Sequence, residues 1–166
     1  MKLSDFDYEL PKELIAQNPL EKRDSSRLLV IHRDTGNIEH KVFSNILDYI
    51  KKGDCLVFND SKVIPARLFG TKKDTGAFVE FLLSKRIQGD VWETLVRPGR
   101  RLKIGDTVCF GDNQELCAQV ISHGEEGTRH VRFSYNGDFM DILEKLGRMP
   151  LPPYIEREST QADKSR

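Results

Sequence analysis

Apolar and polar positions alternate with a period of two over much of the chain, which predicts short β-strands separated by tight turns. Between residues 63 and 135 the pattern predicts six strands, over residues 63–70, 77–84, 91–97, 107–110, 116–122 and 129–135. In the last strand, apolar side chains alternate strictly with polar ones, as in a sheet with one buried and one solvated face. Six short strands with tight turns favour a small antiparallel barrel or sandwich.

Other patterns flank this β-rich region. Residues 28–32 and 38–42 form two further predicted strands joined by a turn at Thr35–Gly36. Apolar residues at i, i+3, i+4 and i+7 predict a helix over residues 43–50, and Pro11 and Pro19 bound a shorter one. A last helix is expected between Asp138, which can cap it, and Gly147. The PLPPY segment that follows, residues 150–154, is expected to be an extended strap.

The segment LVFNDSKVIPARL, residues 56–68, places polar residues between two apolar runs. We expect a buried strand at Leu56–Phe58, a sharp turn at Asn59–Ser61 and a second strand from Val63 to Leu68. This arrangement would bring Asn59, Asp60 and Arg67 together at strand ends, where rigid scaffolds often present functional groups. A structural turn beside a solvated arginine is the commoner explanation for three such residues.

Composition restricts the possible partners. The chain has 166 residues, enough for one domain or two small ones, and its 26 basic and 26 acidic residues cancel. A nucleic-acid contact would therefore require a local basic patch. The sequence shows neither a long apolar segment nor a leader peptide, so we expect a soluble cytoplasmic protein that does not bind membranes.

Cysteine and histidine usage argues against a metal site or a disulfide framework. Cys55, Cys109 and Cys117 are odd in number and lack a CxxC spacing, and the four histidines are scattered. We expect three free thiols in a reducing compartment and no bound metal. The sequence also lacks the short motifs typical of dinucleotide sites, P-loops, zinc proteases and serine hydrolases.

Two clusters of cations are candidates for binding anions. The segment RPGRRLK surrounds a Pro-Gly turn, and a phosphate backbone could contact its cations Arg97, Arg100, Arg101 and Lys103. A second cluster, KRDSSR at residues 22–27, could grip a carboxylate, ribose or phosphate through Arg23 and Arg27. Both clusters could equally be solvated or internally paired surface.

Four separated segments, in this order and spacing, resemble one enzyme family. They are FDYELPKELIAQNPLEKRDSSRLLV at 6–30, LVFNDSKVIPARL at 56–68, WETLVRPGRRLKIGD at 92–106 and GRMPLPPYIER at 147–157. The chain is similar throughout to the S-adenosylmethionine:tRNA ribosyltransferase-isomerases of queuosine biosynthesis, whose members are about twice as long. The resemblance therefore implies an N-terminal portion of such an enzyme.

The resemblance implies an α+β, β-rich fold in which a small antiparallel β-barrel domain is inserted into part of a larger α/β domain. Residues 1–65 would begin the large domain, residues 66–148 would form the barrel, and residues 149–166 would return to the large domain. The family's proposed active site lies in the groove between the two domains.

The resemblance also implies a reaction. The ribosyl group of S-adenosylmethionine, acting as substrate, is transferred to 7-aminomethyl-7-deazaguanine at the tRNA wobble position and rearranges, giving epoxyqueuosine and releasing adenine and methionine. No metal is needed, because the sulfonium already activates the neighbouring carbon and its protons. The implied enzyme acts as a monomer on tRNA.

Within this scheme, Asp60 and Asn59 are the candidate catalytic residues, for proton handling and for orienting a hydroxyl. Arg67, Arg23, Arg27 and Tyr154 are the candidate substrate-binding residues, and the cations of RPGRRLK are the candidate tRNA contacts. Many relatives have Thr-Arg where this chain has Ser61-Lys62, which removes a planar guanidinium. The alternative hypothesis is an RNA-binding β module without catalytic activity.

Overall fold

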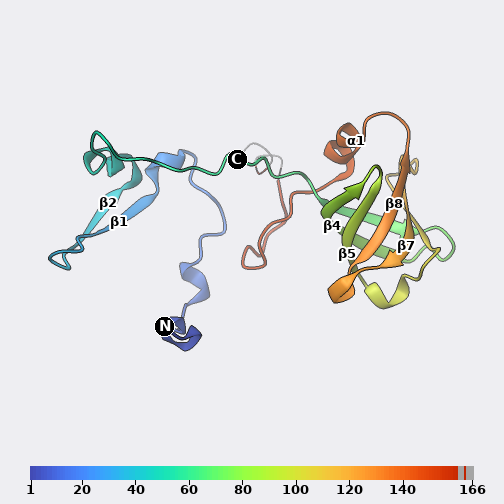
Figure 1. Ribbon diagram of the computed structural model, residues 1–166, viewed down its shortest axis with the longest axis horizontal. Helices are drawn as coiled ribbons and strands as arrows, with labels where there is room; N and C mark the ends of the chain where they lie inside the picture. The colour runs from blue at the N-terminus through green and yellow to red at the C-terminus, as the bar shows by residue number, and fades with distance from the viewer. Residues whose placement is uncertain (161–162, 164–166) are drawn as a thin grey trace. The chain divides into compact units, whose positions relative to one another are not determined.

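The computed structural model describes residues 1–160 and 163. The chain divides into two compact units (Figure 1). The first comprises Met1–Asp60 with Pro153–Arg157, and the second comprises Ser61–Pro152 with the segment from Glu158. We refer to them as the N-terminal unit and the barrel unit.

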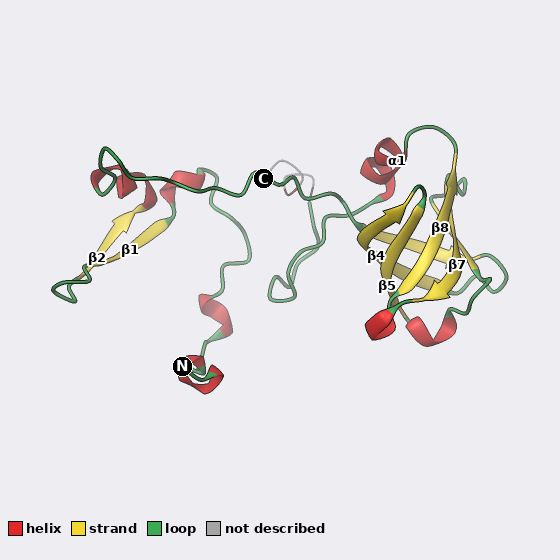
Figure 2. Cartoon of the chain, in the orientation of Figure 1, coloured by secondary structure: helices red, strands yellow, loops and turns green. Residues whose placement is uncertain are grey.

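The barrel unit is a closed six-stranded antiparallel barrel with the strand order β3-β4-β5-β8-β7-β6 (Figure 2). Pairing of β3 with β6 closes it. The strands are β3 (Arg67–Lys72), β4 (Phe78–Gln88), β5 (Val91–Arg97), β6 (Thr107–Phe110), β7 (Leu116–His123) and β8 (Arg129–Tyr135). Short 3-10 helices follow β5 and β7, namely η5 (Gly99–Arg101) and η6 (Glu125–Gly127). The predicted β-rich fold with a small antiparallel barrel is confirmed.

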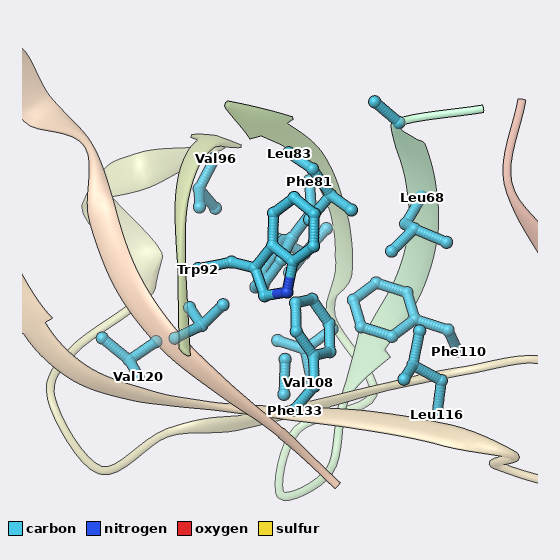
Figure 3. Close-up of a cluster of buried hydrophobic side chains, with 14 of the residues drawn as sticks. Leu68, Phe81, Leu83, Trp92, Val96, Val108, Phe110, Leu116, Val120 and Phe133 are labelled. Atoms are coloured by element: carbon cyan, nitrogen blue, oxygen red, sulfur yellow. The ribbon is translucent and has the colours of Figure 1, made fainter. Parts of the chain in front are cut away.

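Inward-facing side chains of these strands form one apolar core (Figure 3). Phe81 and Phe110 meet edge to face with ring centroids 5.2 Å apart, a favoured aromatic geometry. The backbone of β3 approaches β6 so closely at Gly70 that a Cβ there would lie 2.6 Å from the carbonyl oxygen of Cys109. Only glycine fits at that position, so the β3–β6 closure depends on it.

Helix α1 (Phe139–Leu146) packs against this core through Phe139 and Leu143. Asp138 begins the helix because its carboxylate accepts hydrogen bonds from the backbone amides of Met140 and Asp141, at 2.8 and 3.1 Å. Phe139 and Leu143 are buried in the barrel core. The predicted helix between Asp138 and Gly147 is confirmed.

The N-terminal unit contains one hairpin and short helical turns. Its elements are η1 (Leu3–Phe6), η2 (Lys12–Leu14), η3 (Arg23–Ser25), β1 (Arg27–Ile31), β2 (Ile38–Val42) and η4 (Phe43–Asp48). The two predicted strands pair antiparallel, Arg27 opposite Val42 and Ile31 opposite Ile38. The apolar stripe after them forms the 3-10 helix η4, so the prediction of a regular helix over residues 43–50 is wrong in type and length. None of residues 1–60 is buried.

The segment at residues 56–68 differs from the prediction. Leu56, Val57 and Phe58 form no strand and are 52%, 90% and 79% exposed. The strand expected from Val63 begins instead at Arg67. A strand requires a partner for its backbone groups, and no described segment pairs with residues 56–58. Apolar composition alone was therefore a misleading signal for a buried strand here.

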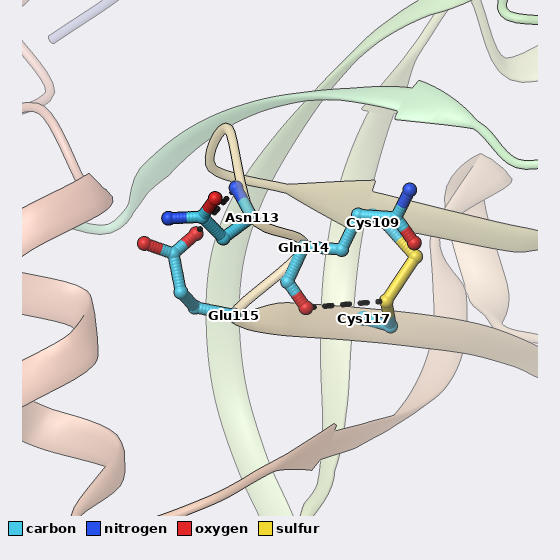
Figure 4. Close-up of a disulfide and its surroundings, with 5 residues drawn as sticks. All are labelled: Cys109, Asn113, Gln114, Glu115 and Cys117. Atoms are coloured by element: carbon cyan, nitrogen blue, oxygen red, sulfur yellow. Dashed lines mark hydrogen bonds between the residues drawn. A yellow bond between two sulfur atoms is a disulfide. The ribbon is translucent and has the colours of Figure 1, made fainter.

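The prediction of three free thiols is wrong for two of them. Cys109 and Cys117 lie directly opposite each other in the β6–β7 hairpin, with Cα atoms 4.1 Å apart, and form a disulfide (Figure 4). Their spacing of eight residues becomes a cross-strand pair only through the hairpin register, which no cysteine motif encodes. Cys55 is free and exposed.

Among residues 1–160 and 163, no helix combines the length and the apolar character required to span a bilayer.

Candidate functional site

The two leading catalytic candidates lie at the end of the N-terminal unit. Asn59 and Asp60 are exposed in an irregular segment, and residues 56–58 directly before them form no strand. Arg67 belongs to the barrel unit, at the start of β3. The structure therefore places Asn59 and Asp60 in one unit and Arg67 in the other.

Arg67 is held within the barrel unit by both its backbone and its side chain. Its amide and carbonyl bond the backbone of Arg148, at 3.1 and 2.8 Å, and its Nε lies 3.1 Å from Glu80 Oε1. Both side chains of this ion pair are mostly covered, with 33% and 25% exposure. Any carboxylate or phosphate that binds Arg67 would therefore compete with Glu80.

Tyr154 lies where hydrogen bonds join two segments far apart in the sequence, Gln17 and residues 154–157, which we call the polar crossing. The sequence did not reveal this contact. The side-chain amide of Gln17 donates to the carbonyl of Tyr154 at 3.0 Å, and its oxygen accepts from the amide of Glu156 at 2.7 Å. Arg157 Nε donates to the carbonyl of Gln17 at 2.8 Å. Gln17 thus ties residues 154–157 to the segment after η2, beside a hollow of about 410 Å³.

This crossing modifies the expectation of an extended strap at residues 150–154. Residues 149–152 are irregular, and the chain turns at Pro153–Tyr154. Lys12 adds an ion pair to Glu156, with Nζ 3.2 Å from Oε1. A lone glutamine carries no motif, and only the proximity of two segments far apart in sequence identifies Gln17 as an organising residue.

Arg23 and Arg27 lie at η3 and at the start of β1, and both are exposed. Ser26, between them, donates to the carbonyl of Arg23 at 3.0 Å and accepts the amide of Phe43 at 2.7 Å, which fixes the backbone. Within the described residues neither guanidinium has an ion-pair partner. Both cations are therefore available to an anionic ligand.

The basic loop after β5, residues 97–103, is anchored at several points. Leu102 is buried, and Arg129 donates to the carbonyl of Gly99 at 3.1 Å. The amide of Lys103 donates to Asp106 Oδ2 at 2.7 Å, and this bond together with Lys72 Nζ at 3.0 Å lowers the pKa of Asp106 below its ordinary value. The loop backbone is therefore fixed by the barrel.

Three of the loop's cations are exposed on this fixed backbone. Arg97, Arg100 and Lys103 are exposed and form no ion pair with any described residue. The side chain of Arg101 lies outside the described part of the structure. A rigid loop presenting unpaired cations is suited to contact a phosphate backbone.

A polar ladder that the sequence did not indicate crosses the outer face of the barrel. Ser122 Oγ lies 2.9 Å from His130 Nδ1, and His130 Nε2 lies 3.5 Å from Glu93 Oε2. The three residues are neighbours across β7, β8 and β5. Cross-strand pairing accounts for the arrangement without assigning it a reaction. Elsewhere in the described residues, no cluster of three or more His, Cys, Asp or Glu is arranged to hold a metal ion.

Comparison with known proteins identifies the family. Residues 3–166 match the family model described as queuosine biosynthesis protein. The chain belongs to this family. It is 56% identical over 164 residues to the S-adenosylmethionine:tRNA ribosyltransferase-isomerase of Acetivibrio thermocellus, covering 99% of this chain and 48% of the relative. The corresponding protein of Thermoanaerobacter sp. (strain X514) is 54% identical over 164 residues, with the same two coverages.

A solved member of the same group is the S-adenosylmethionine tRNA ribosyltransferase of Thermotoga maritima. It shares 44% sequence identity with the chain over 86% of this chain and 48% of that one, with a TM-score of 0.42. The chain of this queuosine biosynthesis family member thus spans about half the length of the curated relatives that it matches, 48% in each case.

Proposed function

We propose that the chain contributes to an S-adenosylmethionine:tRNA ribosyltransferase-isomerase, which transfers and isomerises the ribosyl group of S-adenosylmethionine onto 7-aminomethyl-7-deazaguanine at the tRNA wobble position. The observation that carries the proposal is 56% identity over 164 residues to an enzyme of that name. The product is epoxyqueuosine, and adenine and methionine leave. The proposed donor is S-adenosylmethionine itself, without a metal.

In this proposal the N-terminal unit binds the sulfonium substrate. Asp60 would accept a proton, and Asn59 would orient a hydroxyl of the sugar. Arg23 and Arg27 would bind the methionine carboxylate or a phosphate, in keeping with their lack of described ion-pair partners. Tyr154, fixed by Gln17, would line the substrate site. Arg67 is the remaining proposed substrate-binding residue, and it would have to exchange Glu80 for the ligand.

The barrel unit would hold the tRNA. Arg97, Arg100, Arg101 and Lys103 are the proposed phosphate contacts, because the loop that carries them is anchored by Leu102 and Arg129. The proposed domain division follows residues 1–65, 66–148 and 149–166, with the large α/β domain completed by sequence that relatives have beyond the matched half. We propose a monomeric enzyme of the cytoplasm that does not bind membranes.

A second candidate is an RNA-binding β module without catalysis. One observation favours it, since the barrel unit has its own buried core and its own basic loop. Under this hypothesis the chain would bind tRNA with steep salt dependence and would not bind S-adenosylmethionine.

The decisive experiment uses a hybrid, in which the part of the A. thermocellus relative that this chain does not match is joined after Arg166. The hybrid, the intact relative and the 166-residue chain are each incubated with S-adenosylmethionine and tRNA carrying the precursor base, and adenine release is measured. We expect release by the hybrid. An inactive hybrid that is folded and binds S-adenosylmethionine, beside an active relative, would contradict the proposal.

The role of Asp60 is tested in the same hybrid. Asp60→Asn should lower kcat about 100-fold or more if the carboxylate acts as general base, because such residues contribute about 10²–10⁴ in rate. Asp34→Asn, at the exposed turn of the β1–β2 hairpin, is the matched control and should leave kcat unchanged. If Asp60→Asn turns over like the unmodified hybrid, Asp60 has no part in the mechanism.

A further inference from the structure

Two phenylalanines lie on the outside of the barrel, where strands usually carry polar side chains. In β3, Leu68 and Gly70 face the core while Phe69 faces outward, and in β4 Phe78 is 63% exposed. The rings of Phe69 and Phe78 are stacked, with centroids 5.7 Å apart and planes inclined by 17°. The barrel core does not use this aromatic surface, and contiguous exposed apolar groups are a feature of interaction sites.

A cation lies beside the stacked rings. The guanidinium of Arg148 lies 5.0 Å from the centroid of the Phe69 ring, within the range of a cation–π interaction. Its backbone is fixed by the reciprocal bonds to Arg67, and the preceding Gly147 is packed so tightly that a Cβ there would collide with the carbonyl of Pro65. We call Phe69, Phe78 and Arg148 the aromatic platform.

The aromatic platform borders a hollow of about 700 Å³ in the barrel unit. The turn between β6 and β7, where Asp112 and Asn113 are exposed, also lines this hollow (Figure 4 shows Asn113 and Glu115). Lys145 Nζ lies 2.8 Å from Glu115 Oε1 and balances that carboxylate. The hollow therefore combines aromatic faces, one guanidinium and hydrogen-bonding groups, in a volume typical of small-ligand sites.

From this arrangement we infer that the aromatic platform stacks one unpaired nucleobase of an RNA, with Arg148 at the adjoining phosphate and Asp112 and Asn113 at the base edge. Sequence-tolerant binding of single-stranded RNA uses this combination, base stacking on aromatic rings with a cation at the backbone. Asp112 would oppose a phosphate but accept base N–H groups, which fixes the orientation. The inference rests on the proposed function for the identity of the RNA, a tRNA.

The test uses the 166-residue chain and an anticodon stem–loop RNA with 2-aminopurine in its loop. Binding is followed by fluorescence anisotropy, and stacking by quenching of the 2-aminopurine emission. Phe78→Leu keeps an apolar side chain and removes the ring, whereas Phe78→Trp restores a stacking face. Leu95→Ala is the control, since Leu95 is an apolar barrel residue of comparable exposure, 46%, that does not border the hollow.

Phe78→Leu should weaken binding roughly 10-fold and reduce the quenching, because loss of one base–aromatic stack has effects of this order. Phe78→Trp and Leu95→Ala should bind like the unmodified chain. Arg148→Gln should lower the slope of log Kd against log salt by about 1, whereas Phe78→Leu should leave that slope unchanged.

Two outcomes overturn the inference. The first is that Phe78→Leu binds the RNA with unchanged affinity and unchanged quenching. If Arg100→Gln weakens binding in the same assay, the proposed tRNA contact of the basic loop is supported and the aromatic platform is not. The other is a chain that binds no stem–loop RNA. Conversely, if Phe78→Leu loses affinity while the hybrid enzyme releases no adenine, the aromatic platform is supported and the proposed enzyme activity fails.

Discussion

The two units of the chain differ in how they dispose of their apolar side chains. In the barrel unit, apolar residues of all six strands and of α1 meet in one core, where Leu68, Phe81 and Leu143 have no exposed surface. In the N-terminal unit the apolar residues of the hairpin stay outside, with Leu29, Ile31 and Ile38 54%, 62% and 58% exposed. The barrel unit thus has a buried apolar core, whereas the apolar side chains of the N-terminal hairpin remain at least partly exposed.

This difference is a difference in the source of stability. A closed barrel pairs the edges of its sheet and excludes water from its interior, so its strands hold one another. A two-stranded hairpin is marginal in water without a surface to pack against. We infer that the barrel unit is stabilised by its own contacts, whereas the hairpin of the N-terminal unit has no apolar core among the described residues on which to pack.

The largest expected effect comes from the barrel core. Phe81→Ala should reduce the free energy of unfolding by about 3–5 kcal/mol, because it leaves a cavity beside Phe110. Leu29→Ala in the N-terminal unit should change it by less than about 0.5 kcal/mol, since Leu29 is already exposed. Urea unfolding followed by far-ultraviolet circular dichroism measures both, while the fluorescence of Trp92, the single tryptophan and a core residue, reports the barrel unit alone. Similar losses in the two variants would abolish the contrast between the units.

The next effect concerns barrel closure. Gly70→Ala should cost about 1–3 kcal/mol, because the new methyl group would be forced against Phe110 and the backbone of Cys109. Gly99→Ala is the matched control, since its Cβ would come no closer than 3.9 Å to Arg129. Thermal unfolding by circular dichroism compares the two. An unaltered Tm for Gly70→Ala would show that the β3–β6 contact is looser than described.

A smaller effect is expected at the start of α1. Asp138→Ala should cost about 1 kcal/mol, because two backbone amides lose their acceptor. Asp138→Asn retains an acceptor oxygen and should stay within a few tenths of a kcal/mol of the unmodified chain. Urea unfolding of both variants checks the difference, and equal losses would point to the charge of Asp138 rather than its capping bonds.

The smallest effect is a pH dependence. The amide of Lys103 and the ammonium of Lys72 lower the pKa of Asp106 in the folded chain, so its stabilisation is present above the unfolded pKa, about 3.9, and is lost as the pH falls through the folded value. In Asp106→Asn the side-chain oxygen can still accept the hydrogen bond from the amide of Lys103, but the side chain does not titrate. Between about pH 5 and pH 3, Asp106→Asn should therefore lose less stability than the unmodified chain, by under about 1 kcal/mol. If both chains lose the same stability over this pH range, Asp106 does not contribute to the pH dependence.

Strand periodicity predicted the barrel because the barrel strands pair with one another and bury their apolar side chains in a shared core. In β5, β6 and β8 the predicted and observed bounds agree, and α1 begins directly after its expected cap. The failures have a common physical cause. Leu56–Phe58 has the composition of a buried strand, but no described partner pairs with it, and the disulfide between Cys109 and Cys117 depends on hairpin register. Both depend on strand pairing, which the apolar pattern and the cysteine spacing do not encode.

The candidate site was predictable only in its charged loops. The cations of residues 97–103 were recognisable as a cluster in the sequence, and the structure shows how Leu102 and Arg129 anchor the backbone of this loop. Nothing in the sequence marked Gln17, because its role arises from contacts with a distant segment. Tyr154, one of its partners, lies 137 positions further along the chain. Side chains alternate between the two faces of a strand, so Phe69, which follows the inward-facing Leu68 in β3, faces outward. This alternation could be read from the sequence. It identifies an apolar residue that the barrel core does not need.

Native-state amide hydrogen exchange of the 166-residue chain tests the contrast between the two units most directly. Amides of β4, β7 and β8 should exchange only through global opening of the barrel, whereas amides of β1 and β2 should exchange through local opening at far smaller free energy. We expect protection factors in the barrel strands to exceed those of the hairpin by orders of magnitude. Equal protection in the hairpin and the barrel would contradict the account, because it would mean that residues 1–60 are stabilised as strongly as a unit with its own core.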